Sequence, residues 1–213
     1  MSAILRASRA VVTRAAARQV VGRHFASPAA VKLGKIVAQE AQHEKEQYQQ
    51  APIIAEFTKG SPWKFEHTAG EVNLSLSQTL EDKTKVVVEW QLSSPTDMGD
   101  EDEPEESNEF TITVTKPSGA TVVFYCSTER GESHRYVIGN VSCFASEEEA
   151  NNQASYTGPE FEDLDDKLQE SFDEYLAEIG LHEKLCDFID ATAADAEQKE
   201  YARWLDNMGK FVQ

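Results

Sequence analysis

The fold of this chain is decided by the stretch Phe110-Thr-Ile-Thr-Val-Thr-Lys-Pro-Ser-Gly-Ala-Thr-Val-Val-Phe-Tyr-Cys126. Apolar residues alternate with threonines up to Thr115, a Lys-Pro-Ser-Gly turn follows, and a second alternating run ends at Cys126. Alternation with a period of two is typical of a strand with one buried face, and so short a turn joins antiparallel neighbours. The stretch therefore predicts a β-hairpin inside an antiparallel sheet.

The same period extends on both sides of this hairpin, over residues 62–158. Runs of alternating residues are bounded by Gly, Pro, Asp or Ser, which are turn residues. With two shorter segments, Trp63–His67 and Ser155–Gly158, the expected total is about seven strands. One apolar face and one polar face predict a sheet that is covered on one side only.

Helices are expected before and after this sheet. Residues 31–49 contain no proline and are rich in Ala, Gln, Glu and Lys, so they predict a helix whose thin apolar stripe needs a partner. Residues 160–213 predict two to three helices, with a stop near Gly180 and an alanine-rich link at 191–196. The sharpest apolar stripe, expected in the core or at a subunit contact, comprises Tyr201, Trp204, Leu205, Met208, Phe211 and Val212. The fold class is therefore α+β.

The first 25 residues differ from the rest of the chain. They contain five arginines, and the first acidic residue of the chain is Glu40. An arginine-rich, acid-free amphipathic N-terminus is typical of a mitochondrial transit peptide, and Arg23 places the expected cleavage after Phe25. The alternative is a disordered basic arm that binds RNA or a partner. Residues 26–213 would then form a single acidic domain.

The charge balance excludes several classes of function. The 213 residues include 20 Lys and Arg against 38 Asp and Glu, a formal net charge of -18. Loss of the five N-terminal arginines would leave 15 basic residues and a net charge of about -23. Direct nucleic-acid binding is unfavourable for such a protein, because affinity for phosphates comes mainly from cationic groups. An anionic membrane surface would repel it. The sequence contains no apolar run of about 18 residues, so no transmembrane helix is predicted.

No catalytic or cofactor motif is present in the sequence. Nucleotide-binding glycine patterns, HExxH and GxSxG are all missing, so we expect neither an enzyme nor a bound cofactor. His182 and Cys186 are spaced to share a metal on a helix, but two ligands do not make a site. The three cysteines cannot all pair within one chain, which favours reduced thiols in an intracellular compartment.

Two acidic segments are the candidate binding regions. One is a loop between two strands, 97–109, interrupted by Gly99 and Pro104 and free of basic residues. The other runs from Glu160 to Glu178 with Lys167 as its one basic residue, and forms the solvated face of a helix. The acidic loop is the expected partner-binding site, although it could be a solvated connector or a weak, diffuse cation site that lacks the EF-hand pattern. Its eight carboxylates are Asp97, Asp100, Glu101, Asp102, Glu103, Glu105, Glu106 and Glu109.

Two C-terminal segments resemble a known family. They are Phe172-Asp-Glu-Tyr-Leu-Ala-Glu-Ile-Gly180 and Glu200-Tyr-Ala-Arg-Trp-Leu-Asp-Asn-Met-Gly-Lys-Phe-Val212. Together with the arginine-rich start, the first helix, the strands and the acidic loop after the third strand, they are similar to the mitochondrial acidic matrix protein family. That family is also called the mitochondrial glycoprotein family, and its human member is described as the receptor for globular heads of complement.

The resemblance implies a highly twisted seven-stranded antiparallel sheet with the first and last helices paired along one side. It also implies a doughnut-shaped homotrimer. Family members are non-enzymatic adaptors or chaperones of the mitochondrial matrix, linked to RNA processing (including RNA editing), ribosome assembly and translation. With the acidity of this chain, the expected partners are basic, Arg-rich RNA-binding or ribosomal proteins. The alternative is a passive structural or weakly Ca²⁺-buffering protein.

Overall fold

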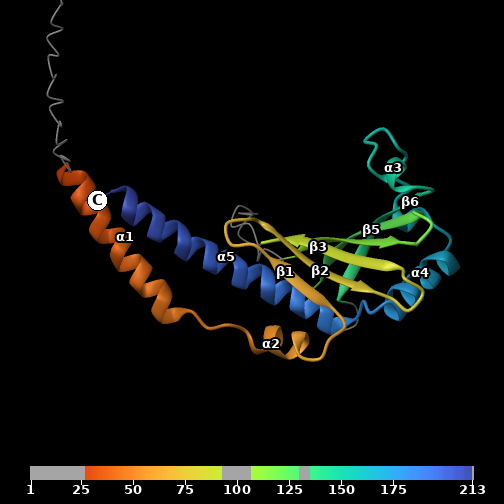
Figure 1. Cartoon of the computed structure of the whole chain (residues 1–213), viewed down its shortest axis with the longest axis horizontal. Coiled ribbons are helices and arrows are strands. Elements are labelled where there is room, and N and C mark those ends of the chain that lie inside the picture. The colour runs from red at the N-terminus through yellow and green to blue at the C-terminus, as the bar shows by residue number, and fades with distance from the viewer. Residues whose placement is uncertain (1–26, 93–106, 130–134, 213) are drawn as a thin grey trace, which may run out of the picture.

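The computed structural model describes residues 27–92, 107–129 and 135–212. It contains an antiparallel sheet with helices on one face and a pair of helices that extends beyond the sheet (Figure 1). Each strand is hydrogen-bonded to the next one along the chain, so the sheet is a simple meander. The strands are β1 (Lys64–His67), β2 (Asn73–Thr79), β3 (Lys85–Gln91), β4 (Glu109–Thr115), β5 (Thr121–Thr128) and β6 (Tyr136–Phe144).

The β4–β5 hairpin predicted from the sequence is confirmed. Phe110 lies opposite Cys126 and Ile112 opposite Phe124, and all four side chains are buried. Gly119 closes the turn at φ 90°, a left-handed conformation that glycine adopts without strain. The intervening threonines face the other side of the sheet, which gives the one-sided cover that the alternation predicted.

The sequence analysis predicted about seven strands, and the described residues form six. Residues 155–158 run beside β6 without forming a ladder, and the contact is a single bridge between Asn140 and Glu160. Side chains make the remaining contacts: Ser142 Oγ donates to the Thr157 carbonyl at 2.5 Å and Asn140 Nδ2 to that of Pro159 at 2.7 Å. Proline has no N–H to donate, so the ladder cannot continue there.

The helices differ from the expectations in α2, in the four-residue α3 and in α5. α2 begins at Pro52, because proline is favoured at the first helical position, whereas the sequence analysis predicted no helix between residues 49 and 62. α5 continues through the alanine-rich residues 191–196 as one helix, and Ala193 and Ala196 are buried. The helices are α1 (Pro28–Gln47), α2 (Pro52–Thr58), α3 (Glu147–Ala150), the 3-10 helix η1 (Phe161–Asp163), α4 (Asp166–Glu178) and α5 (Glu183–Phe211).

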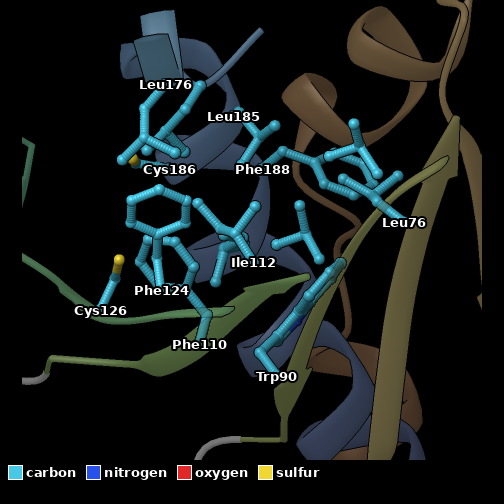
Figure 2. Packing of buried hydrophobic residues seen from close by; sticks show 14 of the residues in the cluster. Leu76, Trp90, Phe110, Ile112, Phe124, Cys126, Leu176, Leu185, Cys186 and Phe188 are labelled. Carbon is cyan, nitrogen blue, oxygen red and sulfur yellow. The ribbon is translucent and has the colours of Figure 1, made fainter. Parts of the chain in front are cut away.

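The hydrophobic core lies between the sheet and the helices on its covered face. Figure 2 shows Phe124 of β5 and Trp90 of β3 directed toward side chains of α5. Phe188 of α5 lies at the centre, with its ring centroid 4.5 Å from that of Phe57 and 5.2 Å from that of Phe65. The first half of α5 is thus fixed to the sheet by aromatic packing.

The second half of α5 pairs with α1 beyond the sheet (Figure 1). We call α1 together with residues 197–211 of α5 the arm. Tyr48 Oη donates to Asp195 at 2.8 Å, and Lys45 pairs with Asp206 at 3.5 Å. The pairing of the first and last helices, which the family resemblance implied, is confirmed. Among the described residues, no helix is both long enough and apolar enough to span a bilayer.

Candidate functional site

Most of the predicted acidic loop lies outside the described residues. This applies to Asp97, Asp100, Glu101, Asp102, Glu103, Glu105 and Glu106. Glu109, the last of the eight, is the first residue of β4; it is exposed and pairs across the sheet with Ser127. The role of the loop in partner binding therefore stays a prediction.

The second acidic segment forms an ordered surface on α4. Its apolar residues Leu176 and Ile179 are buried, which turns the opposite face of the helix to solvent. A row of exposed carboxylates, which we call the α4 row, occupies that face at intervals of four residues: Asp166, Glu170, Glu174 and Glu178. None of the four forms an ion pair with a described residue. Side chains four residues apart lie one above the other on a helix, about 6 Å apart along its axis.

Further carboxylates flank the α4 row in the sequence. Between Ala145 and Leu181 the chain has twelve acidic residues, and Lys167 is the one basic residue. Eight of the acidic residues lie outside the α4 row: Glu147, Glu148, Glu149, Glu160, Glu162, Asp163, Asp165 and Asp173. In the described part of the chain, no three His, Cys, Asp or Glu side chains converge on a position where a metal ion could be held. The surface is thus a row of separated anionic groups, and it differs from the convergent oxygen cage that binds Ca²⁺ tightly.

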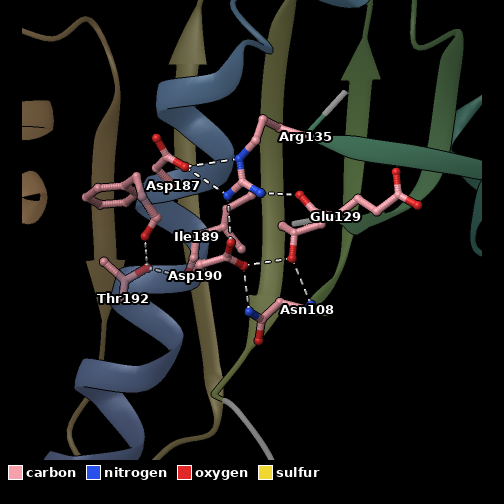
Figure 3. Close-up of polar contacts among 9 residues, drawn as sticks. Asn108, Glu129, Arg135, Asp187, Ile189, Asp190 and Thr192 are labelled. Atoms are coloured by element: carbon pink, nitrogen blue, oxygen red, sulfur yellow. Dashed lines mark hydrogen bonds and ion pairs between the residues drawn. The ribbon is translucent and has the colours of Figure 1, made fainter. Parts of the chain in front are cut away.

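One cationic side chain on the covered side of the sheet, that of Arg135, is paired with carboxylates of the same chain. Arg135, at the start of the β6 segment, donates from Nη2 to Asp187 at 2.8 Å and to Asp190 at 3.0 Å on α5 (Figure 3). The other oxygen of Asp190 accepts from Asn108 Nδ2 and Thr128 Oγ1, each at 2.7 Å. Burial alone would lower the pKa of Arg135, but the two carboxylates outweigh it and raise the pKa.

This cluster ties α5 to the ends of three strands. Asn108 precedes β4, Thr128 ends β5 and Arg135 precedes β6, so Asp190 fixes the place where the acidic loop rejoins the sheet. The sequence analysis missed the cluster, because its members are separated by up to 82 residues and share no local pattern. The available signal was the scarcity of arginine, because Arg135 is one of three arginines after residue 25.

The six residues of the predicted apolar stripe have different environments in the arm. Leu205 is buried against α1, and Tyr201 Oη donates to Glu40 at 3.4 Å. Met208 and Val212 are half-buried. Trp204 stacks on Tyr201 but remains 54% exposed, and Phe211 is 82% exposed. Phe25, the predicted cleavage position, lies outside the described residues.

Comparison with known proteins identifies relatives of this chain. The chain is 31% identical over 170 residues to an uncharacterized mitochondrial protein of Arabidopsis thaliana, a match that covers 74% of this chain and 65% of that protein. It is 32% identical over 108 residues to the mitochondrial acidic protein mam33 of Schizosaccharomyces pombe, covering 48% of this chain and 40% of the relative. The chain thus spans less than two thirds of the length of either relative, and both relatives are named as mitochondrial.

Solved structures share the fold. The Trypanosoma brucei p22 protein superimposes with a TM-score of 0.70 at 22% identity, covering 88% of this chain and all of that one. A Leishmania major protein described as a homologue of human p32 gives a TM-score of 0.69 at 22% identity, covering 87% of this chain and 99% of that one. The family model for mitochondrial glycoprotein, MAM33, matches residues 37–212. With nearly all of the described residues matched, this chain belongs to the mitochondrial glycoprotein (MAM33) family.

Proposed function

We propose that this chain is a non-enzymatic adaptor or chaperone of the mitochondrial matrix that binds basic, Arg-rich proteins. Its partners would be proteins of mitochondrial RNA processing, including RNA editing where present, and of ribosome assembly and translation. The observation that carries the proposal is the α4 row, four exposed carboxylates without an internal cation among the described residues. Membership of a family of mitochondrial acidic proteins supports the location.

The α4 row costs the helix stability. Like charges four residues apart repel one another by about 0.2–0.5 kcal/mol per pair. Glu178, at the C-terminal end of α4, also faces the negative end of the helix dipole. A cationic partner would remove both penalties, so the bound state of α4 is electrostatically better satisfied than the free state.

The spacing of the α4 row suggests which basic segments fit. Carboxylates about 6 Å apart match arginines four residues apart on a helix. They also match arginines at alternate positions of an extended chain, which lie about 7 Å apart. Guanidinium groups pair bidentately with carboxylates, so arginine should bind better than lysine at each position.

The chain contains one example of this chemistry. The guanidinium of Arg135 bridges Asp187 and Asp190, two carboxylates one turn apart on a helix. A partner arginine that bridges Glu170 and Glu174 would make the same kind of contact in a more exposed place. RNA should not bind there, because its phosphates carry the same sign of charge as the α4 row.

We also propose that the protein assembles as a homotrimer through the arm. Large apolar side chains remain exposed on the arm of the single chain, an arrangement typical of interaction surfaces. They are Val31, Leu33, Ile36, Trp204 and Phe211. The arm also carries nearly balanced charge, in contrast with the α4 surface, so like-charge repulsion between copies would be smallest there.

A matched pair of charge variants tests the adaptor proposal. In the first, Asp166→Asn, Glu170→Gln, Glu174→Gln and Glu178→Gln remove the α4 row. In the control, Glu56→Gln, Glu71→Gln, Glu81→Gln and Glu89→Gln remove four exposed carboxylates elsewhere. Binding of an arginine-rich peptide is followed by fluorescence anisotropy between roughly 50 and 300 mM salt, over which range the Debye length falls to below about 8 Å.

The α4 variant should lose affinity and salt dependence, and the control should keep most of both. Equal loss in the two variants would mean that only net charge matters and would contradict a defined surface. A third variant measures how much of the peptide binding comes from the acidic loop. It carries Asp100→Asn, Glu101→Gln, Asp102→Asn, Glu103→Gln, Glu105→Gln and Glu106→Gln. Tight Ca²⁺ binding by the natural chain, with no peptide binding, would favour the buffering alternative.

A further inference from the structure

The turn between β1 and β2 contacts α5 at the point where the helix leaves the sheet. The backbone N–H of Gly70, in that turn, donates to Glu200 Oε1 at 2.7 Å. The other oxygen of the same carboxylate accepts from Arg203 Nε at 2.8 Å. Gly70, Glu200 and Arg203, which we call the clasp, thus join the sheet to the arm through one carboxylate.

The fit within the clasp is close. Gly70 has φ +93°, a conformation that side chains disfavour, and a Cβ at this position would collide with the guanidinium of Arg203. The Glu200 side chain is only 19% exposed. Burial would raise the pKa of Glu200, but the Gly70 amide and Arg203 outweigh it and lower the pKa. The carboxylate is therefore held in its charged form by the groups that it joins.

The clasp lies at the root of the arm. On the N-terminal side of Glu200, Ala193 and Ala196 are buried. On its C-terminal side, Leu205 is the one fully buried residue of α5. Near the same point of α5, Asp195 accepts a hydrogen bond from Tyr48, the residue that follows α1. α5 is thus held to its partner helix through Asp195 and to the sheet through Glu200.

We propose that the clasp sets the direction of the arm relative to the sheet. The fifteen residues of α5 in the arm extend about 22 Å, so a rotation of about 10° at the root moves the tip by about 4 Å. A small change in geometry at the root is therefore amplified along the arm, toward Trp204 and Phe211. This positioning role requires no partner and goes beyond the proposed adaptor function.

The chain offers one natural label position for measuring the direction of the arm. Cys143 is exposed on β6, whereas Cys126 and Cys186 are buried and burial raises the pKa of both thiols to about 12. A spin label will therefore react at Cys143. The second label is placed on the arm by Asn207→Cys, at an exposed position. Labelled chains are diluted into unlabelled ones so that pulsed electron resonance reports distances within one chain.

The natural chain should give one narrow distribution of distances. Glu200→Ala and, independently, Gly70→Ala should broaden it or move its mean, and Glu174→Ala, which removes an exposed helix carboxylate elsewhere, should leave it unchanged. Hydrogen exchange of the Gly70 amide should accelerate on the order of tenfold in Glu200→Ala, as expected for the loss of a bond to a charged acceptor.

An unchanged distribution in both variants, with the faster exchange showing that the bond is lost, would overturn the proposal. If Glu200→Ala fails to fold, Glu200→Gln replaces it, because the amide keeps an acceptor for Gly70 and loses the charge that holds Arg203. The glutamine variant should then broaden the distribution with Arg203 released, and a distribution as narrow as that of the natural chain would count against the clasp.

Discussion

Gly34 of α1 lies directly against Val212 at the end of α5. A Cβ at position 34 would be 3.1 Å from Cγ2 of Val212, which is closer than ordinary van der Waals contact. The two helices of the arm therefore come close together where one of them has no side chain, and this approach helps a weakly apolar α1 to stay paired.

Enlarging position 34 should separate the arm. Gly34→Leu would place a branched side chain where Val212 lies, and overpacking of this kind typically costs about 1–3 kcal/mol. Hydrogen exchange in α1 should rise while the sheet amides keep their protection. Ala38→Leu, at an exposed position of the same helix, is the control. Equal exchange in the two variants would show that the close approach is unimportant.

Asp190→Ala should be among the most destabilising single changes in the chain. It leaves Arg135, whose side chain is only 18% exposed, without its better-buried carboxylate partner, and it removes an acceptor of Asn108 and Thr128. Breaking one side of a buried ion pair costs about 3–5 kcal/mol, and urea denaturation should show a loss near the lower end of that range.

The control for this change is Asp187→Ala, because Asp187 holds the same arginine from a half-exposed position. Its loss should cost about 1 kcal/mol or less, as is usual for exposed pairs. Similar losses from the two variants would mean that the hydrogen bonds to Asn108 and Thr128 contribute little.

Asp82 should make stability depend on pH in the acid range. Hydrogen bonds from the Thr84 hydroxyl and amide, and then Lys116 at 3.2 Å, lower the pKa of Asp82 to about 2. A carboxylate with a lowered pKa stabilises the fold above its unfolded pKa of about 3.9, and this contribution is lost as the pH falls toward 2. The natural chain should therefore exceed Asp82→Asn in stability at neutral pH, and the difference should shrink below about pH 4. A difference that is constant down to pH 2 would contradict this assignment.

Trp204→Ala should affect assembly more than folding. Because half of the indole is exposed in the single chain, truncation should cost the monomer much less than the roughly 3–5 kcal/mol of a buried aromatic residue. If the arm forms the trimer contact, light scattering should show a shift toward monomer while circular dichroism stays unchanged. Asn207→Ala, on the same helix, should leave the mass as it is. A natural chain that is monomeric at all concentrations would contradict the trimer.

The sequence predicted the sheet better than its surroundings, for a physical reason. Alternation and turn residues are local, so the β4–β5 hairpin could be derived from seventeen consecutive residues. The path of residues 155–158 depends instead on side-chain bonds to β6, which have no sequence pattern. Residues 191–196 were interpreted as an alanine-rich link, whereas they belong to α5, and Ala193 and Ala196 are buried in the core.

In the candidate site, too, local features could be predicted from the sequence and tertiary contacts could not. The acidity of residues 160–178 and their helical spacing were evident in the sequence, and the buried face of α4 follows from its apolar residues. The pairing of Arg135 with Asp190 was not evident in the sequence, because it depends on how far α5 extends beneath the sheet. Trp204 was expected either in the core or at a subunit contact, and its position four residues after Glu200 places it on the part of the helix that has already left the core.

The continuity of α5 has a consequence for which changes in length the chain can accept. Asp190 and Trp204 lie on one uninterrupted helix, so the number of residues between them determines the angular position of one relative to the other. Inserting or deleting a single residue would turn every side chain of the arm by about 100° around the helix axis while Asp190 stayed fixed beneath the sheet. Inserting four residues would approximately restore the orientation of the arm side chains, but it would lengthen the helix by about 6 Å. Over this segment the number of residues therefore determines which way the side chains of the arm face, whatever the identity of the residues between.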